Sequence, residues 1–479
     1  ALTNQDSPAV RRQAVKDLES GRLHYLVTVD LFNEGVDIPA LNQIVMLRAT
    51  QSATIFIQQL GRGLRLYPGQ DFVTVLDFIG NYQNNYLIPL ALAGKKLSRD
   101  QLKYQLQTVS FAGLSTINFS RIASQEILAS LDKVKLDSLK QLREAYADLA
   151  QQLGRAPLLL DFAKKGQVSP RLWLDNKSLP HYGAFLEKMG QPCQLSSYES
   201  QVLSFVTKEL APGQRPHELL LLQALLPKGQ ISQTDFQALL KNYGAYDSPA
   251  LEKSLEAILS LDFYDVKSGS TSQKAKYGGE PVACLKDGCW SLNPQIVQAS
   301  PDFLRLFKDA VETGLFLAKE KDPTQDFTLY AAYDRKEVCR LLNWPLDVSR
   351  PMYGYRLSGN VCPVFITYQK TDQEQRNARY DNQARGQRLA WYTRTPRHLS
   401  SPEVQQLLRG TESGQQVTRI PVFVKRADAY GPKFYYLGSA KIDPATVREV
   451  NLKGKSAVGL DLVLPDPLPA KIADQLFSN

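Results

Sequence analysis

The first ninety residues alternate between amphipathic and continuously apolar patterns. Ser7 followed by proline predicts a helix start, and Gly21 predicts where that helix has ended. Apolar runs typical of strands buried on both faces occur at residues 23–29, 43–48 and 72–78. A further helix is expected between the last two runs, so strand, crossover and strand predict a parallel α/β sheet in residues 1–94.

The pattern turns helical after this segment. Residues 95–195 keep apolar positions three or four apart, as in the stretch 124–153. Residues 196–322 predict several short helices followed by a small hairpin, which is typical of a winged-helix module. Helical packing without any partner remains the alternative for this region.

Strand-like runs dominate residues 323–479. A short helix over 335–344 precedes them, and the runs lie at 361–369, 388–394, 419–426, 433–442 and 457–464. Their alternation predicts a mostly β domain, with a mostly antiparallel barrel or sandwich. The expected fold class is therefore multidomain: an α/β lobe, a helical and winged-helix-like region, and a mostly β C-terminal domain.

Composition narrows the setting. The 479 residues carry 57 Lys and Arg against 48 Asp and Glu, with 43% apolar residues, which is typical of a globular chain. Five cysteines are too few for a disulfide scaffold. Cys284 and Cys289 lack a second ligand pair for zinc. No secretory or membrane-spanning segment is evident, so we expect a cytoplasmic protein. The opening lacks a methionine and reads like the middle of a fold, so we expect a fragment of a longer polypeptide.

Two loops of the first segment carry candidate chemistry. Gly35 and Asp37 follow a predicted strand, where parallel sheets gather ligands, and Asp37 could accept a ribose hydroxyl. Arg62 and Arg65 share one helix face next to Gly61 and could aim two guanidinium groups at one phosphate. The alternatives are a turn-forming aspartate and a solvated basic helix face.

The sequence of these two loops resembles that of the second RecA-like lobe of superfamily 2 helicases. Residues 28–37 resemble helicase motif V, and residues 58–65, with the pattern Q-x-x-G-R-x-x-R, resemble motif VI. The later segments LYAAYDRKEVCRLLNW, CPVFITYQK, SSPEV and FYYLG are similar to the uncharacterised C-terminal region of a group of bacterial helicases. The resemblance therefore covers most of the chain.

The resemblance implies roles for individual residues. Arg65 would be the arginine finger, with Arg62 beside it on the γ-phosphate of ATP bound with Mg²⁺. Gln58 would sense the nucleotide or the attacking water. Asp37 and Gly35 would lie near the ribose.

The same resemblance gives Thr28 a contact with a nucleic-acid phosphate, although Thr28 could equally be an ordinary β-branched strand residue.

The phosphate cradle for such a reaction is missing from the sequence. Gly454-Lys455-Ser456 is the only tempting loop, but Glu449 stands where its first glycine belongs, and no Asp-Glu dipeptide occurs. The resemblance places both features in a first RecA-like lobe, which would be the partner of this one and would bind most of the nucleotide. We therefore expect the chain alone to be inactive as an ATPase.

A second signal is electrostatic. Between Lys370 and Arg397 there are seven Lys and Arg against three acids, interleaved with aromatic residues. Cations neutralise phosphates and rings stack on bases, so this segment is a candidate nucleic-acid surface. Its candidate contacts are Arg379, Arg388, Trp391 and Arg394. The alternative is a solvated loop with the aromatic rings turned into the domain core.

Two functional hypotheses follow. The first is the C-terminal portion of an ATP-dependent DNA helicase or translocase, and the nucleic acid that we expect it to contact is DNA. The alternative is a non-catalytic nucleic-acid-binding protein with a degenerate RecA-like scaffold.

Overall fold

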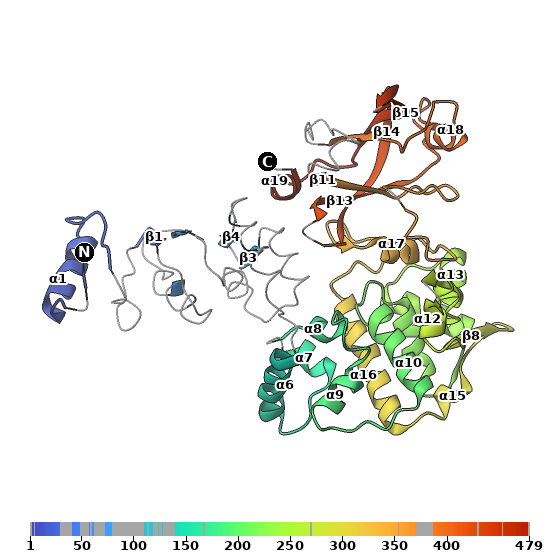
Figure 1. Cartoon of the computed structure of the whole chain (residues 1–479), viewed down its shortest axis with the longest axis horizontal. Coiled ribbons are helices and arrows are strands. Elements are labelled where there is room, and N and C mark those ends of the chain that lie inside the picture. Colours follow the sequence, from blue (N-terminus) through green and yellow to red (C-terminus); the bar gives the residue numbers. More distant parts are fainter. Residues whose placement is uncertain are drawn as a thin grey trace. The chain divides into compact units, whose positions relative to one another are not determined.

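The computed structural model divides the chain into two compact units, one within residues 1–136 and the other centred on residues 137–479 (Figure 1). The structure describes residues 2–3, 5–28, 41–47, 57, 60–61, 72–78, 110–112, 115–117, 123, 127, 139–165, 168–268, 271–352, 354–369, 387–428, 431–452 and 454–477.

In the first unit, helix α1 (Pro8–Glu19) begins as predicted. The Ser7 side chain accepts a hydrogen bond from the Val10 N–H, and Pro8 occupies the first turn, where its missing N–H costs nothing. Strands β1 (Gln43–Met46) and β2 (Thr74–Asp77) pair in parallel, which confirms two of the predicted strands and their direction. They are the described part of the expected RecA-like sheet.

The predicted strand at 23–29 differs. Among its described residues only Thr28 forms a bridge, to Leu2, and the Leu2 N–H donates to the Val27 carbonyl. Tyr25 is 82% exposed and Val27 52% exposed. The run therefore lacks the burial on both faces that its apolar pattern predicted. A separate short pair, β3 (Ser110–Ala112) and β4 (Ser115–Ile117), lies further along the chain.

The second unit opens with helices built on amphipathic patterns. The early helices are α6 (Leu139–Leu153), α7 (Leu159–Lys165), α8 (Arg171–Leu174) and α9 (Tyr182–Lys188). They pack on α16 (Pro301–Ala318), whose Asp309 carboxylate accepts hydrogen bonds from Leu159 N and Leu160 N at the start of α7. The carboxylate thereby satisfies N–H groups that the first turn of a helix leaves unpaired.

Residues 196–298 form the remaining helical part. Its elements in order are α10 (Ser197–Phe205), the π-helical turn η1 (Val206–Leu210), α11 (His217–Leu225), β5 (Gln230–Ser232), α12 (Gln233–Tyr243), α13 (Pro249–Leu259), η2 (Asp262–Tyr264), β6 (Lys267–Ser268), β7 (Thr271–Ser272), α14 (Gln273–Lys276), β8 (Ala283–Lys286), β9 (Cys289–Leu292) and α15 (Pro294–Val297). The small sheet has the strand order β5-β9-β8 and is antiparallel throughout.

The C-terminal region is a mixed six-stranded sheet. Its strands are β10 (Ala332–Tyr333), β11 (Val364–Gln369), β12 (Arg388–Tyr392), β13 (Ile420–Ala427), β14 (Phe434–Leu452) and β15 (Lys455–Val463). The order is β11-β13-β14-β15-β12, with β10 on β14, and the β11–β13 pair is parallel. The predicted strands and their mostly antiparallel pairing are confirmed, since only the β11–β13 pair is parallel, but they form one mixed sheet where a barrel or sandwich was expected.

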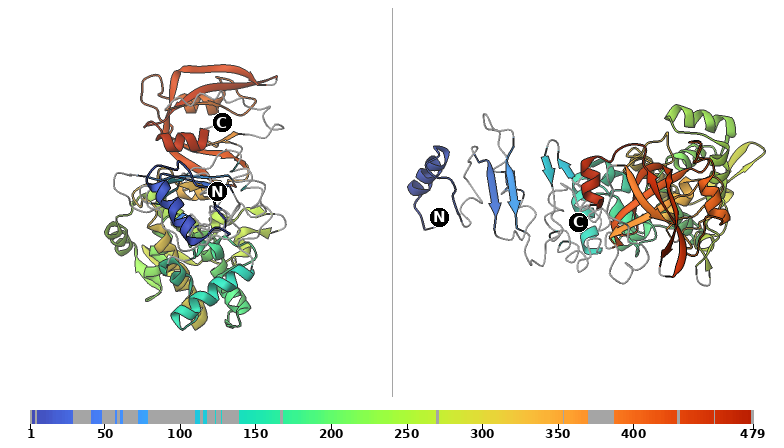
Figure 2. Two further views of the ribbon diagram at one scale, coloured as in Figure 1. Left: turned by 90° about the vertical axis from the view of Figure 1, so that its left-hand side faces the viewer. Right: turned by 90° about the horizontal axis from the view of Figure 1, so that it is seen from above.

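Three helices accompany this sheet: α17 (Arg335–Leu341), α18 (Pro402–Leu408) and α19 (Ala470–Phe477), which lies beside β13 (Figures 1 and 2). Two apolar cores support the unit. One spans the helical part and continues through Trp344 to Phe365, Phe423 and Phe434 on one face of the sheet. The other fills the opposite face, around Trp391 and Val422. The helical part and the sheet therefore share a core.

Candidate nucleic-acid interface

Most of the predicted nucleotide-binding residues lie outside the described residues. This applies to Gln58, Arg62, Arg65, Gly35 and Asp37, whose roles therefore stay predictions.

Two members of the predicted set are described. Gly61 is helical and exposed, and a β-carbon added to it would meet no heavy atom within 4 Å. No contact within the chain therefore requires glycine at this position. Thr28, itself half-buried, forms its bridge to Leu2 at the end of a mostly exposed segment.

Asp77 was missed by the sequence reading. It ends the parallel strand β2, and burial raises the pKa of its carboxyl above the usual value. Its Oδ2 atom is buried without a hydrogen-bond partner. An ionisable group at the carboxyl end of a parallel strand occupies the edge where such sheets bind ligands, so Asp77 joins the candidate residues of this lobe.

The candidate contacts on β12 are engaged within the C-terminal region. Arg388 forms ion pairs with Asp443 and, at 3.9 Å, with Asp461. Arg394 Nη2 lies 2.6 Å from Glu403 Oε1, and its guanidinium lies 5.1 Å from the ring centroid of Tyr355.

Trp391 lies in the core. It is 2% exposed, and its ring meets Tyr355 edge-on with centroids 5.0 Å apart. A ring buried in this way cannot stack on a base. This agrees with the alternative interpretation, in which the aromatic rings turn into the domain core. Arg379 lies outside the described residues.

Serine–histidine chemistry has no support at the pair that comes closest to it. His181 Nε2 lies 2.8 Å from Ser200 Oγ, while His181 Nδ1 accepts the Ala184 N–H. Because Nδ1 accepts, the ring proton resides on Nε2 and is donated to the serine. Burial lowers the pKa of His181 to about 4, which makes the ring a weak base, and its Nε2 already carries a proton and therefore cannot accept one from Ser200.

In the described part of the chain, no group of three or more His, Cys, Asp and Glu residues could hold a metal ion. Cys284 and Cys289 are free thiols on neighbouring strands, and Cys289 Sγ lies 3.5 Å from the Ile231 carbonyl. Among the described helices, none is long and apolar enough to cross a bilayer.

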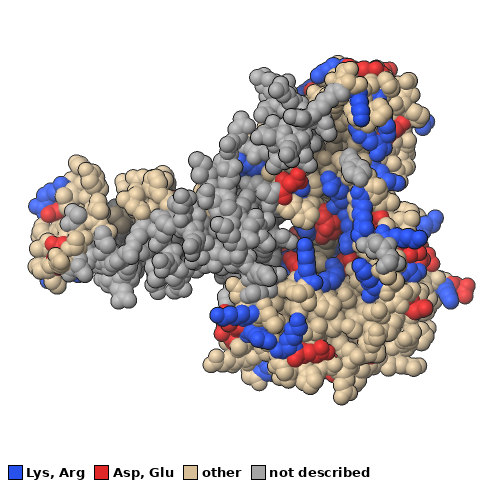
Figure 3. All heavy atoms as spheres, viewed as in Figure 1, with Lys and Arg blue, Asp and Glu red and all other residues tan. Residues whose placement is uncertain are grey.

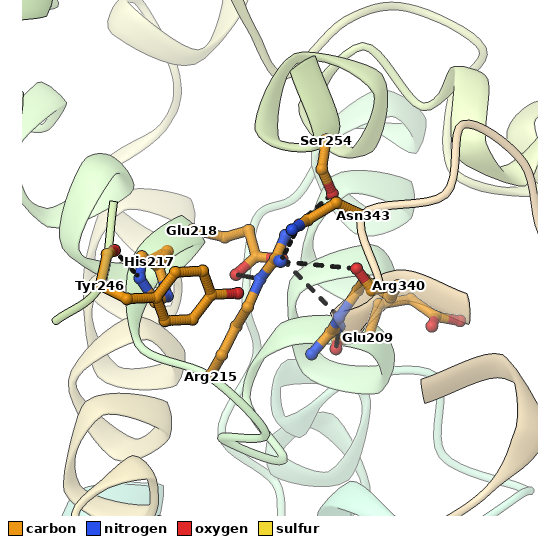
Figure 4. A network of polar contacts seen from close by, with 8 residues as sticks. All are labelled: Glu209, Arg215, His217, Glu218, Tyr246, Ser254, Arg340 and Asn343. Atoms are coloured by element: carbon orange, nitrogen blue, oxygen red, sulfur yellow. Dashed lines mark hydrogen bonds and ion pairs between the residues drawn. The ribbon is translucent and has the colours of Figure 1, made fainter. Parts of the chain in front are cut away.

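A buried ionic network joins the helical part to α17 (Figure 4). Arg215 Nε lies 3.0 Å from both carboxylate oxygens of Glu218, and its Nη1 donates to Asn343 Oδ1 at 2.7 Å. Arg340 Nε lies 3.7 Å from Glu218 Oε1, and Arg340 Nη1 donates to the Glu209 carbonyl. All three charged groups of this centre are at most 4% exposed.

The network holds its charges through mutual attraction. Although burial opposes ionisation, Arg215 and Arg340 lower the pKa of Glu218 to about 2. His217 stays neutral beside Arg215, because burial and the nearby cation lower its pKa to about 4. Its Nε2 donates to the Tyr246 carbonyl at 2.8 Å. We interpret the network as structural, because the charged groups of Arg215, Glu218 and Arg340 are all buried.

Comparison with known proteins agrees with the motifs. Residues 1–67 match the helicase conserved C-terminal domain, residues 142–323 match a domain of unknown function (DUF8090), and residues 327–476 match a second domain of unknown function (DUF3427).

Two curated proteins are similar over short stretches. One is named "Putative ATP-dependent helicase IRC3", from Saccharomyces cerevisiae, and is 29% identical over 26% of this chain and 18% of that protein. The other is a 51.5 kDa protein of a Lactococcus phage, 32% identical over 15% of this chain and 16% of that protein. The chain thus matches less than a fifth of either relative's length.

Two solved structures show weak likeness. The DNA modification-dependent restriction endonuclease AspBHI has a TM-score of 0.21 at 18% identity, over 31% of this chain and 79% of its own. The Type IV phosphorothioation-dependent restriction endonuclease ScoMcrA also has a TM-score of 0.21, at 12% identity, over 63% of this chain and 62% of its own. Scores this low carry no argument about fold. The helicase conserved C-terminal domain and the DUF3427 region match the two stretches on which the resemblance rests, and these matches agree with a protein of the superfamily 2 helicase type.

Proposed function

We propose that this chain is the C-terminal portion of an ATP-dependent DNA helicase or translocase. The observation that carries the proposal is the match of residues 1–67 to the helicase conserved C-terminal domain, because residues 58–65 with their Q-x-x-G-R-x-x-R pattern fall inside it. The parallel pair β1–β2 supports a RecA-like lobe.

In the proposed mechanism, ATP with Mg²⁺ is held mainly by a first RecA-like lobe of the same polypeptide and supplies the phosphoryl group that is cleaved. Arg62 and Arg65 reach that phosphate from this lobe and stabilise the charge that develops on it. Gln58 orients the attacking water, while Asp37 and Gly35 lie at the ribose. Closure and reopening of the two lobes would move Thr28 and its neighbours along one nucleic-acid strand.

We also propose that residues 211–292 form a winged-helix-like module. The order α11, β5, α12, α13, β8 and β9, with the sheet order β5-β9-β8, supports this interpretation. In helix-turn-helix proteins the second helix of the motif enters the major groove. Here that helix is α13, whose solvent side carries Glu252, Lys253 and Glu256. A face with two acids and one base does not suit phosphates, so the module serves as scaffold.

ATP hydrolysis by the full-length polypeptide tests the motor proposal. We expect turnover that DNA stimulates and that Arg65→Ala lowers by about 10³–10⁵-fold, as loss of an arginine finger does in related NTPases. Arg12→Ala on the exposed side of α1 is the matched control and should keep wild-type turnover. Unchanged turnover in Arg65→Ala would remove the finger assignment. A full-length protein without ATPase activity would favour the non-catalytic binding protein with a degenerate scaffold.

A further inference from the structure

Three half-buried cations gather where the helical part meets the C-terminal sheet, and we call Lys321, Arg335 and Lys433 the junction cations. They lie after α16, at the first position of α17 and just before β14, so three separate segments bring them together. Figure 3 shows Lys and Arg side chains gathered on this face of the molecule, between the helices and the sheet.

Lys321 has no acidic partner in ion-pair contact among the described residues. Its Nζ lies 5.0 Å from the ring centroid of Tyr333, a cation–π contact. Burial lowers the pKa of Lys321 to about 8; the charges of Arg171 and Lys433 act in the same direction, and those of Glu337 and Glu320 oppose it. The ammonium thus lies near two cations and two carboxylates without an ion pair of its own among the described residues, so an anion can pair with it directly.

The guanidinium of Arg335 rests against two rings. Its guanidinium carbon lies 5.4 Å from the Phe365 centroid and 5.1 Å from the Phe434 centroid. Its Nε is buried without a hydrogen-bond partner, and no ion pair of this side chain occurs in the described part of the unit. An arginine fixed in this way keeps its donor fork ready for a planar or tetrahedral anion without losing much side-chain freedom on binding.

Lys433 is paired with a carboxylate that other groups also use. Its Nζ lies 3.0 Å from Glu337 Oε1, and the lysine side chain is 37% exposed against 13% for the glutamate. Gln214 Nε2 donates to the same oxygen, and Glu337 Oε2 accepts the Asp334 N–H. Lys433 is therefore the more exposed partner of a carboxylate that is already shared.

The rim of the cluster contains both signs. Arg171 Nη2 lies 3.8 Å from Glu320 Oε2, and there the glutamate is the more exposed partner, at 63% against 13%. On the far side, Lys425 Nζ lies 4.5 Å from the Phe434 centroid and 2.6 Å from Asp428 Oδ1. Each of these rim cations therefore has a carboxylate in ion-pair contact, whereas Lys321 and Arg335 have none in such contact among the described residues. Glu337 and Glu320 lie near Lys321, and Asp428 and Asp334 lie near Arg335, without pairing directly.

We propose that the junction cations bind consecutive phosphates of a nucleic-acid backbone, which makes the junction of the helical part and the C-terminal sheet a second nucleic-acid contact of this protein. Lys321 and Arg335 rest on aromatic rings without an ion pair among the described residues, and Lys433 is the exposed partner of its pair. Cations of this kind are suited to a polyanion, whose phosphates repeat along one line. The identity of the ligand rests on the proposed function. The site itself rests on the geometry of Lys321, Arg335 and Lys433.

Nucleic-acid binding by the 479-residue chain without nucleotide tests the proposal. Single-stranded DNA, duplex DNA and RNA of equal length serve as probes, each titrated with salt. Lys321→Gln/Arg335→Gln should weaken binding at least tenfold to the preferred probe. It should also lower the slope of log K against log salt by about 1.4–1.8, since each lost phosphate contact removes about 0.7–0.9.

Two further variants keep the result interpretable. Lys241→Gln/Lys253→Gln removes the same charge from the exposed sides of α12 and α13 and should bind like wild type. Lys321→Arg, which keeps the charge, should bind nearly as well as wild type, whereas Lys321→Gln alone should lose one contact even if Arg335→Gln disturbs packing. A wild-type chain that binds none of the probes, or equal salt slopes in the charge-removing variants and wild type, would overturn the proposal. ATPase activity plays no part in this measurement, so a failed motor proposal leaves it unaffected.

Discussion

Arg215 lies just before helix α11 and Glu218 lies within its first turn, with both carboxylate oxygens 3.0 Å from the guanidinium Nε, and neither residue is more than 4% exposed. Arg340, which comes from α17, shares the same carboxylate. One acid thus balances two buried cations from two regions of the chain that match different family models.

Glu218→Gln should destabilise the second unit strongly. The substitution keeps the shape but leaves Arg215 and Arg340 buried without a counter-charge, and breaking a buried pair on one side costs about 3–5 kcal/mol. The free energy of unfolding from urea titration measures this. Glu256→Gln on the exposed side of α13 is the control and should change it by less than about 0.5 kcal/mol. A loss no greater than in this control would mean that Arg215 finds other partners.

The contribution of His181 and His217 to stability should fall as pH falls from 6.5 to about 4. Both rings are neutral when folded, with pKa values lowered to about 4, while the unfolded chain binds their protons near 6.5. At these two rings the unfolded state carries more protons in this window, so each contribution falls by up to about 1.4 kcal/mol per pH unit. Burial raises the pKa of Asp309 to about 7 and that of Asp334 to about 6, and these two carboxyls act in the opposite direction. His217→Gln removes one ring's contribution, so its stability curve should diverge from that of wild type below pH 6.5, whereas the curve of His24→Gln, at an exposed position, should not. Parallel curves for wild type and His217→Gln would contradict the assignment.

Trp391→Ala should act on stability. Removal of this fully enclosed ring leaves a cavity beside Tyr355, and such truncations cost about 3–5 kcal/mol. Thermal unfolding of the C-terminal sheet measures the loss, with the partly exposed Val417→Ala as a mild reference. Weakened nucleic-acid binding at unchanged stability would instead restore Trp391 as a stacking residue.

Gly410→Ala and Gly414→Ala separate backbone strain from steric overlap. Both glycines have a positive φ, of 79° and 74°, so alanine costs about 1 kcal/mol at either position. At Gly410 the new β-carbon would also lie 2.1 Å from the Gln415 carbonyl oxygen, whereas at Gly414 it meets open space. The loss of unfolding free energy should therefore be clearly larger for Gly410→Ala. Equal losses would show that the turn at 410–415 adjusts freely.

Local patterns predicted the elements of this protein well. The helices at Pro8 and Arg335 and the strands of the C-terminal sheet lie where capping residues and alternation placed them. The strand order was beyond reach, because the parallel β11–β13 pair joins segments more than fifty residues apart. The run at 23–29 shows the converse, since its apolar composition alone did not produce burial.

The candidate sites divide in the same way. The helicase motif at residues 58–65 could be recognised from sequence because its spacing is local, while the roles of its residues stay predictions. The junction cations gave no such signal, since Lys321 and Lys433 are 112 positions apart and each stands among ordinary charged residues. The burial of Trp391 was expected only by the alternative in which the aromatic rings turn into the domain core.

Because Arg215 and Arg340 share Glu218, the two regions that carry them constrain each other's evolution. A recombinant that joined residues 142–323 of this chain to the C-terminal region of a distant relative would strand a charge in the interior unless the incoming α17 supplied the matching guanidinium. We therefore expect the two regions to be retained together during evolution, and grafting experiments should transfer both.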